Sequence, residues 1–207
     1  MSPFDVILFD VGGVLLTNGW DHAERAAAAA HFRLDAQELE ARHARVAPAW
    51  ERGEIDLNAY LDATVFYEPR GFSREEFFDF MLAQSRLLPD GAMPILKELS
   101  TSNGGSRDSM IGALNNEARE TNEFRFGKFD LRRYFNVALT SCYVGLRKPE
   151  PAMFRRALDI LSRPPQRVLF IDDREENVAG AAAAGITAIR FRGEEALWND
   201  LEKLGVV

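Results

Sequence analysis

The sequence predicts an α/β fold built on a doubly wound parallel sheet, with a bundle of helices inserted after the first strand. Three observations predict it. A short apolar run, Val6–Phe9, ends at Asp10 and two glycines, which is typical of a strand buried on both faces. A block of helical patterns without strands then extends to about residue 86. From Pro89 onward, strand-like runs alternate with helical patterns, which indicates βαβ units.

The composition is that of a globular chain with a sizeable core. Its 207 residues suffice for one large domain or for one domain with an insertion, and 46% of them are hydrophobic. The formal net charge of −7 argues against nucleic acid and against an anionic membrane as partners. Cys142 is the single cysteine, the N-terminus has no basic signal-peptide start, and every apolar run is far shorter than a membrane span. We therefore expect a cytoplasmic protein.

The segment from residue 18 to residue 86 carries start signals for four helices. The residues placed to cap them are Asp21, Asp35, Asp56 and Ser73. Ser73 with Glu76 forms a capping box, and Gly53 ends the second helix. The expected helices cover roughly residues 21–31, 35–51, 56–67 and 73–82. Consecutive helices without strands predict a separate helical domain at 18–86, with residues 1–17 and 87–207 forming the α/β core domain.

The second half of the chain predicts the rest of the sheet. Four apolar runs are expected to be strands, at residues 110–114, 137–140, 168–171 and 187–191. Five helical patterns surround them, at residues 91–99, 117–126, 149–161, 175–184 and 194–204. Pro149 and Pro151 open the third of these helices, and Gly185 ends the fourth. Ser100–Ser109 contains no apolar residue and predicts a flexible loop.

Four predicted strand ends carry polar residues. They are Asp10, Asn115 with Asn116, the loop 141–149 with Lys148, and Asp172 with Asp173. Each alone is an ordinary turn residue, loop charge or helix cap. Because the carboxyl ends of parallel strands share one edge of the sheet, these side chains can converge. Three carboxylates so close together repel one another unless a cation lies between them, and a hard divalent cation with oxygen ligands, together with the lysine, provides one.

Four motifs in this order resemble those of the haloacid dehalogenase (HAD) superfamily. They are FDVGGVL at Phe9–Leu15, LNN at Leu114–Asn116, GLRKPEP at Gly145–Pro151 and FIDDREENVAGA at Phe170–Ala181. The helical segment between the first two is similar to that superfamily's helical cap in its first insertion point. The resemblance covers essentially the whole chain. It implies a HAD-like, Rossmannoid core with the first strand central, covered by a cap.

The resemblance also implies a hydrolase that depends on Mg²⁺ and removes phosphate from a small phosphorylated metabolite. Asp10 matches the nucleophile, which would form an aspartyl-phosphate. Asp10, the backbone carbonyl of Gly12 and Asp173 match the ligands of Mg²⁺, and Asp172 matches a neighbour in its outer shell. Lys148 matches the cation that pairs with the nucleophile and the phosphoryl oxygens.

Other residues of the motifs are expected to bind the substrate. Asn115 stands where the family usually has a serine or threonine hydroxyl for the phosphate, and its amide can still donate a hydrogen bond. Asn116, Gly12 and Gly13 are expected to line the substrate site. Asn177 occupies a position where many members carry a further acid.

One departure from the family pattern affects the expected rate. Phosphatases of the family usually have a second aspartate two residues after the nucleophile, where it acts as general acid and base. Here that position is Gly12. Since a positioned acid or base contributes ~10²–10⁴-fold, turnover should be slow unless another group acts instead. Asp21 and His22 are the nearest candidates, although a helix cap and a solvated histidine are their simpler interpretation.

Two other functions are compatible with these residues. In a dehalogenase-type hydrolase, Asp10 would attack carbon without a metal; the acidic pair Asp172–Asp173 argues against it. A protein that only binds a phosphorylated ligand or a partner would also explain Gly12 and Asn115.

Several other side chains have structural interpretations. Trp20, Trp50 and Tyr60 are expected in the hydrophobic core rather than in a substrate pocket. Arg52 is expected to pair with a surface acid, and Cys142 to be a buried thiol.

Overall fold

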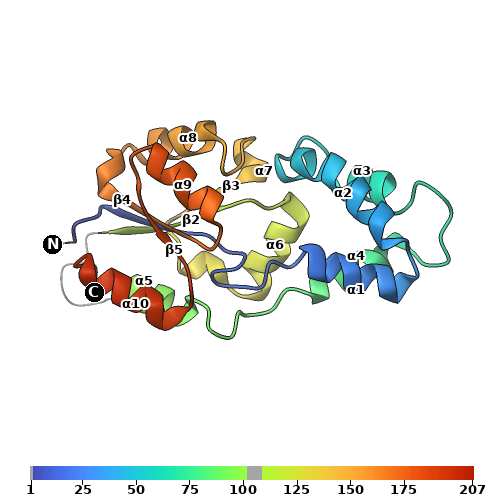
Figure 1. Cartoon of the computed structure of the whole chain (residues 1–207), viewed down its shortest axis with the longest axis horizontal. Coiled ribbons are helices and arrows are strands. Elements are labelled where there is room, and N and C mark those ends of the chain that lie inside the picture. The colour runs from blue at the N-terminus through green and yellow to red at the C-terminus, as the bar shows by residue number, and fades with distance from the viewer. Residues whose placement is uncertain (1, 102–108) are drawn as a thin grey trace.

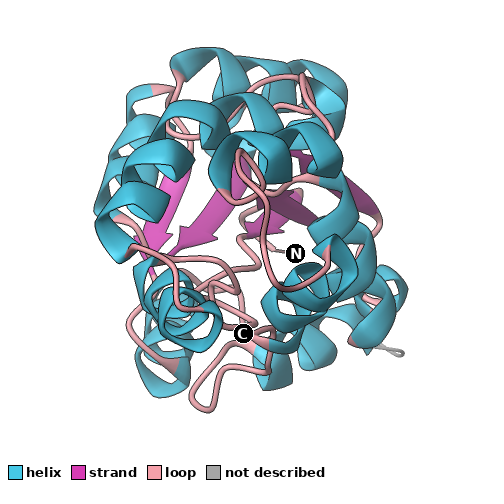
Figure 2. Cartoon of the chain, turned by 90° about the vertical axis from the view of Figure 1, so that its right-hand side faces the viewer, coloured by secondary structure: helices cyan, strands magenta, loops and turns pink. Residues whose placement is uncertain are grey.

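The structure, a computed structural model, describes residues 2–101 and 109–207. Within these ranges lies a sheet of five parallel strands in the order β3-β2-β1-β4-β5 (Figures 1 and 2). The strands are β1 (Val6–Phe9), β2 (Met110–Asn115), β3 (Val137–Thr140), β4 (Val168–Asp172) and β5 (Thr187–Arg190). The first strand is therefore central, and the predicted doubly wound parallel α/β fold is confirmed.

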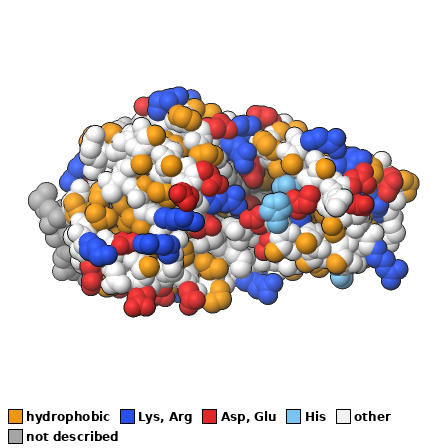
Figure 3. Space-filling view, in the orientation of Figure 1, with side chains coloured by type: hydrophobic (Ala, Val, Ile, Leu, Met, Phe, Trp, Pro, Cys, Tyr) orange, Lys and Arg blue, Asp and Glu red, His pale blue; other side chains and the backbone are white. Residues whose placement is uncertain are grey.

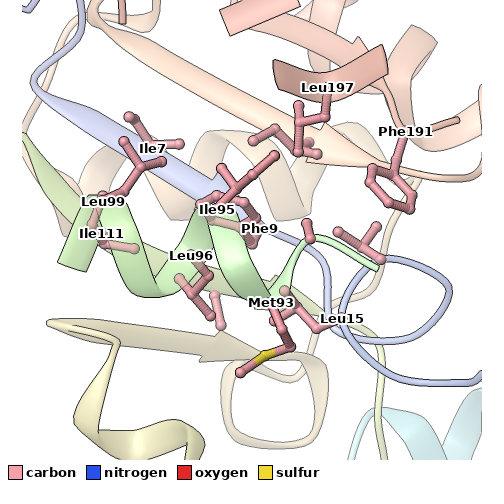
Figure 4. Close-up of a cluster of buried hydrophobic side chains, with 14 of the residues drawn as sticks. Ile7, Phe9, Leu15, Met93, Ile95, Leu96, Leu99, Ile111, Phe191 and Leu197 are labelled. Carbon is pink, nitrogen blue, oxygen red and sulfur yellow. The ribbon is translucent and has the colours of Figure 1, made fainter. Parts of the chain in front are cut away.

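Helices cover both faces of the sheet. Those on one face are α5 (Met93–Thr101), α6 (Arg119–Lys128) and α10 (Glu194–Lys203), and those on the other are α8 (Pro151–Leu161) and α9 (Glu175–Ala183). The side chains of β1 alternate between the two cores: Ile7 and Phe9 pack on the first face (Figure 4), and Val6 and Leu8 on the second. Each is at most 1% exposed, and full burial of such a side chain contributes about 1.5–3 kcal/mol.

Four more helices lie between β1 and β2 in the chain. They are α1 (His22–Phe32), α2 (Ala36–Glu51), α3 (Leu57–Thr64) and α4 (Arg74–Ala83). Figure 1 shows them gathered at the end of the molecule that lies away from both termini. They bury a third hydrophobic cluster, which includes Tyr60, Leu61, Phe77 and Met81 and is joined by Ala118 at the start of α6.

The predicted starts of these helices are confirmed. The side chains of Asp21, Asp35, Asp56 and Ser73 each accept a hydrogen bond from a backbone N–H in the first turn of the helix that follows. The box of Ser73 and Glu76 is present with both of its hydrogen bonds. Such a cap contributes about 1 kcal/mol, so these four residues set where the helices begin.

Some boundaries differ from prediction. Helix α3 ends at Thr64 rather than near residue 67, because Val65 leaves the helical backbone conformation. Helices α5 and α6 each begin two residues later than expected, and β5 ends one residue earlier. Pro149 does not open α8; Pro151 is its first residue, where a missing N–H costs nothing.

The loops also contain structure that local patterns did not predict. The expected loop 141–149 contains the short helix α7 (Ser141–Val144), and two 3-10 turns lie at Leu131–Arg133 and Pro165–Arg167. Of the predicted flexible loop, Ser100 and Thr101 end α5, and residues 102–108 lie outside the described residues. No helix in the described part of the chain has both the length and the apolarity needed to cross a membrane.

Candidate active site

Three carboxylates meet at the carboxyl edge of the two central strands. Asp10 directly follows β1, whereas Asp172 ends β4 and Asp173 follows it. The parallel register that pairs Phe9 with Ile171 brings these ends side by side, and Asp10 N donates to the Ile171 carbonyl over 2.9 Å. One oxygen of each carboxylate lies within 4.8 Å of the others. The structure thus brings together the three acids that the sequence predicts to share a site.

Lys148 lies between two of these acids. Its Nζ is 3.0 Å from Asp10 Oδ1 and 2.7 Å from Asp172 Oδ2. It also donates to the Leu114 carbonyl over 2.7 Å. The residue is 1% exposed, so the ammonium has exchanged its water for these three oxygens. A buried ammonium is tolerated in such a place only when charge partners surround it.

Asn116 holds the backbone of this lysine in place. Its Oδ1 accepts from Lys148 N over 2.9 Å, and its Nδ2 donates to the Lys148 carbonyl over 2.8 Å. The side chain at the end of β2 therefore pairs with the loop after β3 as a neighbouring strand would. These two hydrogen bonds fix the loop that carries Lys148, and thereby the position of its ammonium group.

Burial and mutual repulsion shape the charge state of the acids. Burial raises the pKa of Asp10 to about 7, against the opposing effect of Lys148 and with the help of Asp172. Burial and then Asp172 also raise the pKa of Asp173. Burial disfavours the charged ammonium, but Asp10 and Asp172 outweigh it and raise the pKa of Lys148, which stays protonated. The cluster therefore holds excess negative charge that a further cation would neutralise.

The donor set fits a hard divalent cation. Asp173 Oδ1 is buried and finds no hydrogen-bond partner among residues 2–101 and 109–207. By contrast, Asp172 is saturated: it accepts from Lys148 Nζ, from Arg174 N and, with both oxygens, from Asn177 Nδ2. An unused buried carboxylate oxygen is costly unless something binds it. The chemistry thus separates Asp173, which has room for a direct ligand bond, from Asp172, which orients its neighbours.

A cavity of about 390 Å³ opens beside Asp10, the one acid of the three that is among its lining residues. Its floor includes Asp10, Gly12 and Lys148 from the α/β part, and its other wall comes from α1 and α2. Figure 3 shows the surface hollowed there, where the helical part meets the α/β part, with charged side chains around the opening. The site is therefore enclosed from both sides, which is the usual form of a small-molecule pocket.

Asn115 requires a correction. Its side chain is buried and does not line the cavity. Its Oδ1 accepts from Thr140 Oγ1 over 2.9 Å, and its Nδ2 donates to Asn122 Oδ1 over 3.3 Å. Because β2 and β3 pair these positions, Asn115 faces Thr140 and satisfies a buried polar group there. The expected contact of this amide with a phosphate finds no support in the structure.

Asp21 and His22 have the structural roles that are their simpler interpretation. Asp21 caps α1 and its Oδ2 lies 3.0 Å from Nη2 of Arg174. His22 Nδ1 lies 3.0 Å from Glu40 Oε2, and its side chain is 82% exposed. Both also line the cavity.

Most of the side chains that were given structural interpretations have them in the structure. Arg52 pairs with Glu150, as expected for a surface ion pair. Tyr60 and Trp50 are buried and stack with ring centroids 4.0 Å apart, as expected of the core, yet Trp50 and Trp20 also line the cavity. Cys142 is buried, and burial raises its pKa to about 12.

Sequence reasoning missed the helical wall of the cavity. On α2, the residues that face it are Glu40, His43, Ala44, Ala47, Pro48, Trp50 and Glu51. They recur every three to four positions, so the helical period marks them as one face. That face is less apolar than a core face, which is the signal that could have identified it.

Comparisons with known proteins identify the family to which this chain belongs. A family model described as haloacid dehalogenase-like hydrolase matches residues 4–185. Among curated proteins, flavin mononucleotide hydrolase 1 of Arabidopsis thaliana is 31% identical over 170 residues, which is 82% of this chain and 66% of that protein. The chain spans less than two thirds of the length of the curated relatives that it matches first.

Solved structures share the fold. A HAD family enzyme from Bacteroides thetaiotaomicron, in complex with magnesium and inorganic phosphate, superposes with a TM-score of 0.72 at 18% identity, covering 92% of this chain and 95% of that one. L-2-haloacid dehalogenase from Xanthobacter autotrophicus superposes with a TM-score of 0.63 at 18% identity, over 99% of this chain and 84% of that one. At such identities, the likeness extends to the fold alone.

Proposed function

Because this chain belongs to the haloacid dehalogenase-like hydrolases, we propose that it is a Mg²⁺-dependent phosphatase that acts on a small phosphorylated metabolite. The observation that carries the proposal is the cluster of Asp10, Asp172 and Asp173 around Lys148, with one buried oxygen of Asp173 unpartnered. The flavin mononucleotide hydrolase among the relatives also supports a phosphomonoester as substrate.

In this proposal Asp10 is the nucleophile. A carboxylate oxygen of Asp10 attacks phosphorus, the bond from phosphorus to the ester oxygen breaks, and the alcohol leaves. Water then cleaves the aspartyl-phosphate and releases inorganic phosphate, which regenerates the carboxylate. Lys148, 3.0 Å from Asp10 Oδ1, neutralises charge on the phosphoryl oxygens, and Asp172 and Asn116 keep the ammonium in position.

The metal would be held by Asp10, Asp173 and the carbonyl of Gly12. When bound, Mg²⁺ supplies positive charge that balances the phosphoryl group and the acids around it. Asp172 has no free oxygen for this task, since Lys148, Arg174 N and Asn177 occupy both. Gly12 lines the cavity beside Asp10, whereas Gly13, which we expected to line the substrate site, is not among the lining residues and lies against Asp173 instead.

The absence of a side chain at Gly12 shapes the substrate preference. Without a positioned acid, the departing alcohol must take its proton from water or from its own hydroxyls. Esters of acidic alcohols, such as aryl phosphates, should therefore react much faster than alkyl phosphates. A strong dependence of the rate on leaving-group pKa would distinguish this site from one with a general acid.

We also propose that residues 18–86 form a cap domain over a core of residues 1–17 and 87–207. The two connections run side by side: Thr17 N donates to the Arg86 carbonyl, and Thr17 Oγ1 donates to the Gln84 carbonyl, each over 2.9 Å. Leu16 and Leu87 pair as an antiparallel bridge. Two adjacent connecting segments of this kind are suited to act as a hinge, and closure would exclude water from the cleft.

The test is phosphate release from sugar, nucleotide and acid phosphates, including flavin mononucleotide, with Mg²⁺. We expect release with at least one of them, loss of it on chelation, and loss of it in Asp10→Asn. Activity on a haloacid that survives the chelator would support the dehalogenase alternative instead. Tight binding of phosphorylated ligands that is the same in Asp10→Asn, with no release, would support a binding protein.

A further inference from the structure

The cap side of the cavity carries a polar side chain that the proposed chemistry does not use. His43 lies on α2, lines the cavity, and is followed on the same face by Ala44 and Ala47. The cavity wall next to the histidine therefore includes two small side chains. Whatever is attached to the phosphoryl group at Asp10 must extend toward this wall, because both belong to one cavity.

The cations around this wall are already committed to carboxylates. Arg25 is 4% exposed, its Nε and Nη2 donate to both oxygens of Glu40, and its Nη1 donates to the Trp20 carbonyl. The other cavity arginines are paired in the same way, as Arg125–Glu117, Arg147–Glu51 and Arg174–Asp21. Because these arginines are already paired with carboxylates of the protein, the cavity favours a leaving group that is uncharged over one that carries an anionic group in addition to the phosphate.

A chain of hydrogen bonds determines which ring nitrogen of His43 carries the proton. Trp20 Nε1 can only donate, and it donates to Tyr60 Oη over 2.7 Å. The phenol of Tyr60 is fully buried and has one proton of its own, and its Oη lies 2.8 Å from His43 Nδ1. Trp20 Nε1 occupies one side of Oη as a donor, which leaves the phenol proton for the other side, where Nδ1 can accept it. The phenol therefore donates to Nδ1, and the proton of the neutral imidazole is on Nε2.

Nε2 is the ring nitrogen available to the cavity. Nδ1 is held against the buried Tyr60, whose ring stacks on Trp50. Among residues 2–101 and 109–207, no side chain or carbonyl hydrogen-bonds Nε2. An N–H donor that is fixed in direction by three aromatic side chains and is left unpartnered in a pocket is poised for a ligand acceptor.

We propose that His43 is a specificity-determining residue whose Nε2–H donates to a neutral oxygen of the leaving group, so that the substrates are phosphomonoesters of hydroxylated, uncharged alcohols. The assignment rests on the proposed function. The Nε2–H donor of His43 requires a hydrogen-bond acceptor on the part of the substrate beyond the phosphate. It gives His43 no part in breaking the ester bond.

The test compares the binding of two non-hydrolysable phosphonates. One is pentylphosphonate, and the other is its analogue with a hydroxyl on each carbon beyond the one bonded to phosphorus. Titration calorimetry on the full chain with Mg²⁺ should show that the hydroxylated compound binds more tightly. His43→Phe should reduce this preference by about 2- to 10-fold, the effect of one hydrogen bond. An unchanged preference in His43→Phe would overturn the assignment.

Two further measurements guard against a folding defect. His31→Phe is the matched control: His31 stacks on Phe80 in the same helical part and does not line the cavity, so the preference should stay as in the wild type. Nitrogen-15 shifts of the wild-type imidazoles, with the His43 signals identified by their absence in His43→Phe, should show Nε2 protonated. Tyr60→Phe should release that tautomer and weaken the preference, whereas a proton on Nδ1 in the wild type contradicts the assignment.

The outcomes separate this assignment from the proposed function. Discrimination between the phosphonates, together with no phosphate release from any ester, would end the phosphatase proposal and leave the role of His43 intact. Phosphate release with equal discrimination in wild type and His43→Phe would leave the phosphatase and remove the role of His43.

Discussion

A Cβ atom at position 13 would lie 2.3 Å from Oδ2 of Asp173, so Gly13 and Asp173 meet where a larger side chain has no room. Gly13 also has a φ of +71°, in the left-handed region that favours glycine. The turn after β1 therefore comes close to the end of β4. In the part of the chain that the structure describes, nothing hydrogen-bonds the buried Oδ1 of Asp173, the proposed metal ligand.

Gly13→Ala should displace the Asp173 carboxylate. We expect phosphate release to fall by at least about tenfold, because misplacement of a catalytic group by about 1 Å can cost ~10²-fold. Calorimetric titration with Mg²⁺ should show weaker binding. Gly205→Ala is the control, since Gly205 has a similar φ of +69° with open space around it; equal Mg²⁺ affinities in the two variants would contradict the role of the close approach.

Lys148→Met should damage both stability and activity. It leaves Asp10 and Asp172 buried without their common cation, and breaking a buried pair costs about 3–5 kcal/mol. Urea unfolding should show that loss, and phosphate release should fall by ~10²–10³-fold because a charge aimed at the phosphoryl group is removed. Lys203→Met, at an exposed lysine paired with Asp200, should change neither by a measurable amount.

The two adjacent aspartates should respond in opposite ways to the same substitution. Asp173→Asn removes a like charge next to Asp172 and breaks no hydrogen bond of Oδ1 within the described residues. The metal-free variant should therefore melt at the same temperature as the wild type or at a higher one. Mg²⁺ should no longer raise its melting temperature. Asp172→Asn loses its charge toward Lys148 and should lower the melting temperature without Mg²⁺. A reversed order of the two melting temperatures would contradict the assigned division of roles.

The stability of the helical part should fall in mild acid. Burial, with the charge of Arg25 adding to it, lowers the pKa of His43 to about 4 from its ordinary 6.5. The folded state thus binds fewer protons than the unfolded state, so the stabilisation is present above pH 6.5 and is lost as the pH falls toward 4. The full effect is about 3 kcal/mol, at about 1.4 kcal/mol per pH unit.

Unfolding free energies at pH 7 and pH 4.5 measure that effect. The wild type should lose more stability over this range than His43→Phe, which has no proton to bind at that position. Equal slopes for wild type and His43→Phe would show that the unfolding in acid has another source.

The local sequence pattern sufficed to predict the helix starts, the central strand and the polar residues that meet at one edge of the sheet. Helix caps such as Asp35 and Ser73 act within one turn, and the apolar run Val6–Phe9 is continuous because both sides of a central strand are buried. Polar residues placed after successive parallel strands converge by topology alone. For that reason Asp10, Lys148 and Asp173 could be assigned to one site from the chain itself, together with the family.

Tertiary packing decided what local pattern leaves undefined. Asn115 and Asn116 are neighbours of one type, yet Asn115 is the last residue of β2 and pairs with Thr140 within the sheet. Asn116 follows the strand and holds the backbone of Lys148. The tautomer of His43 depends on Trp20 and on Tyr60, which lie on other elements of the chain. Hydrogen bonds between distant residues have no periodicity along the chain, so only the packed structure determines them.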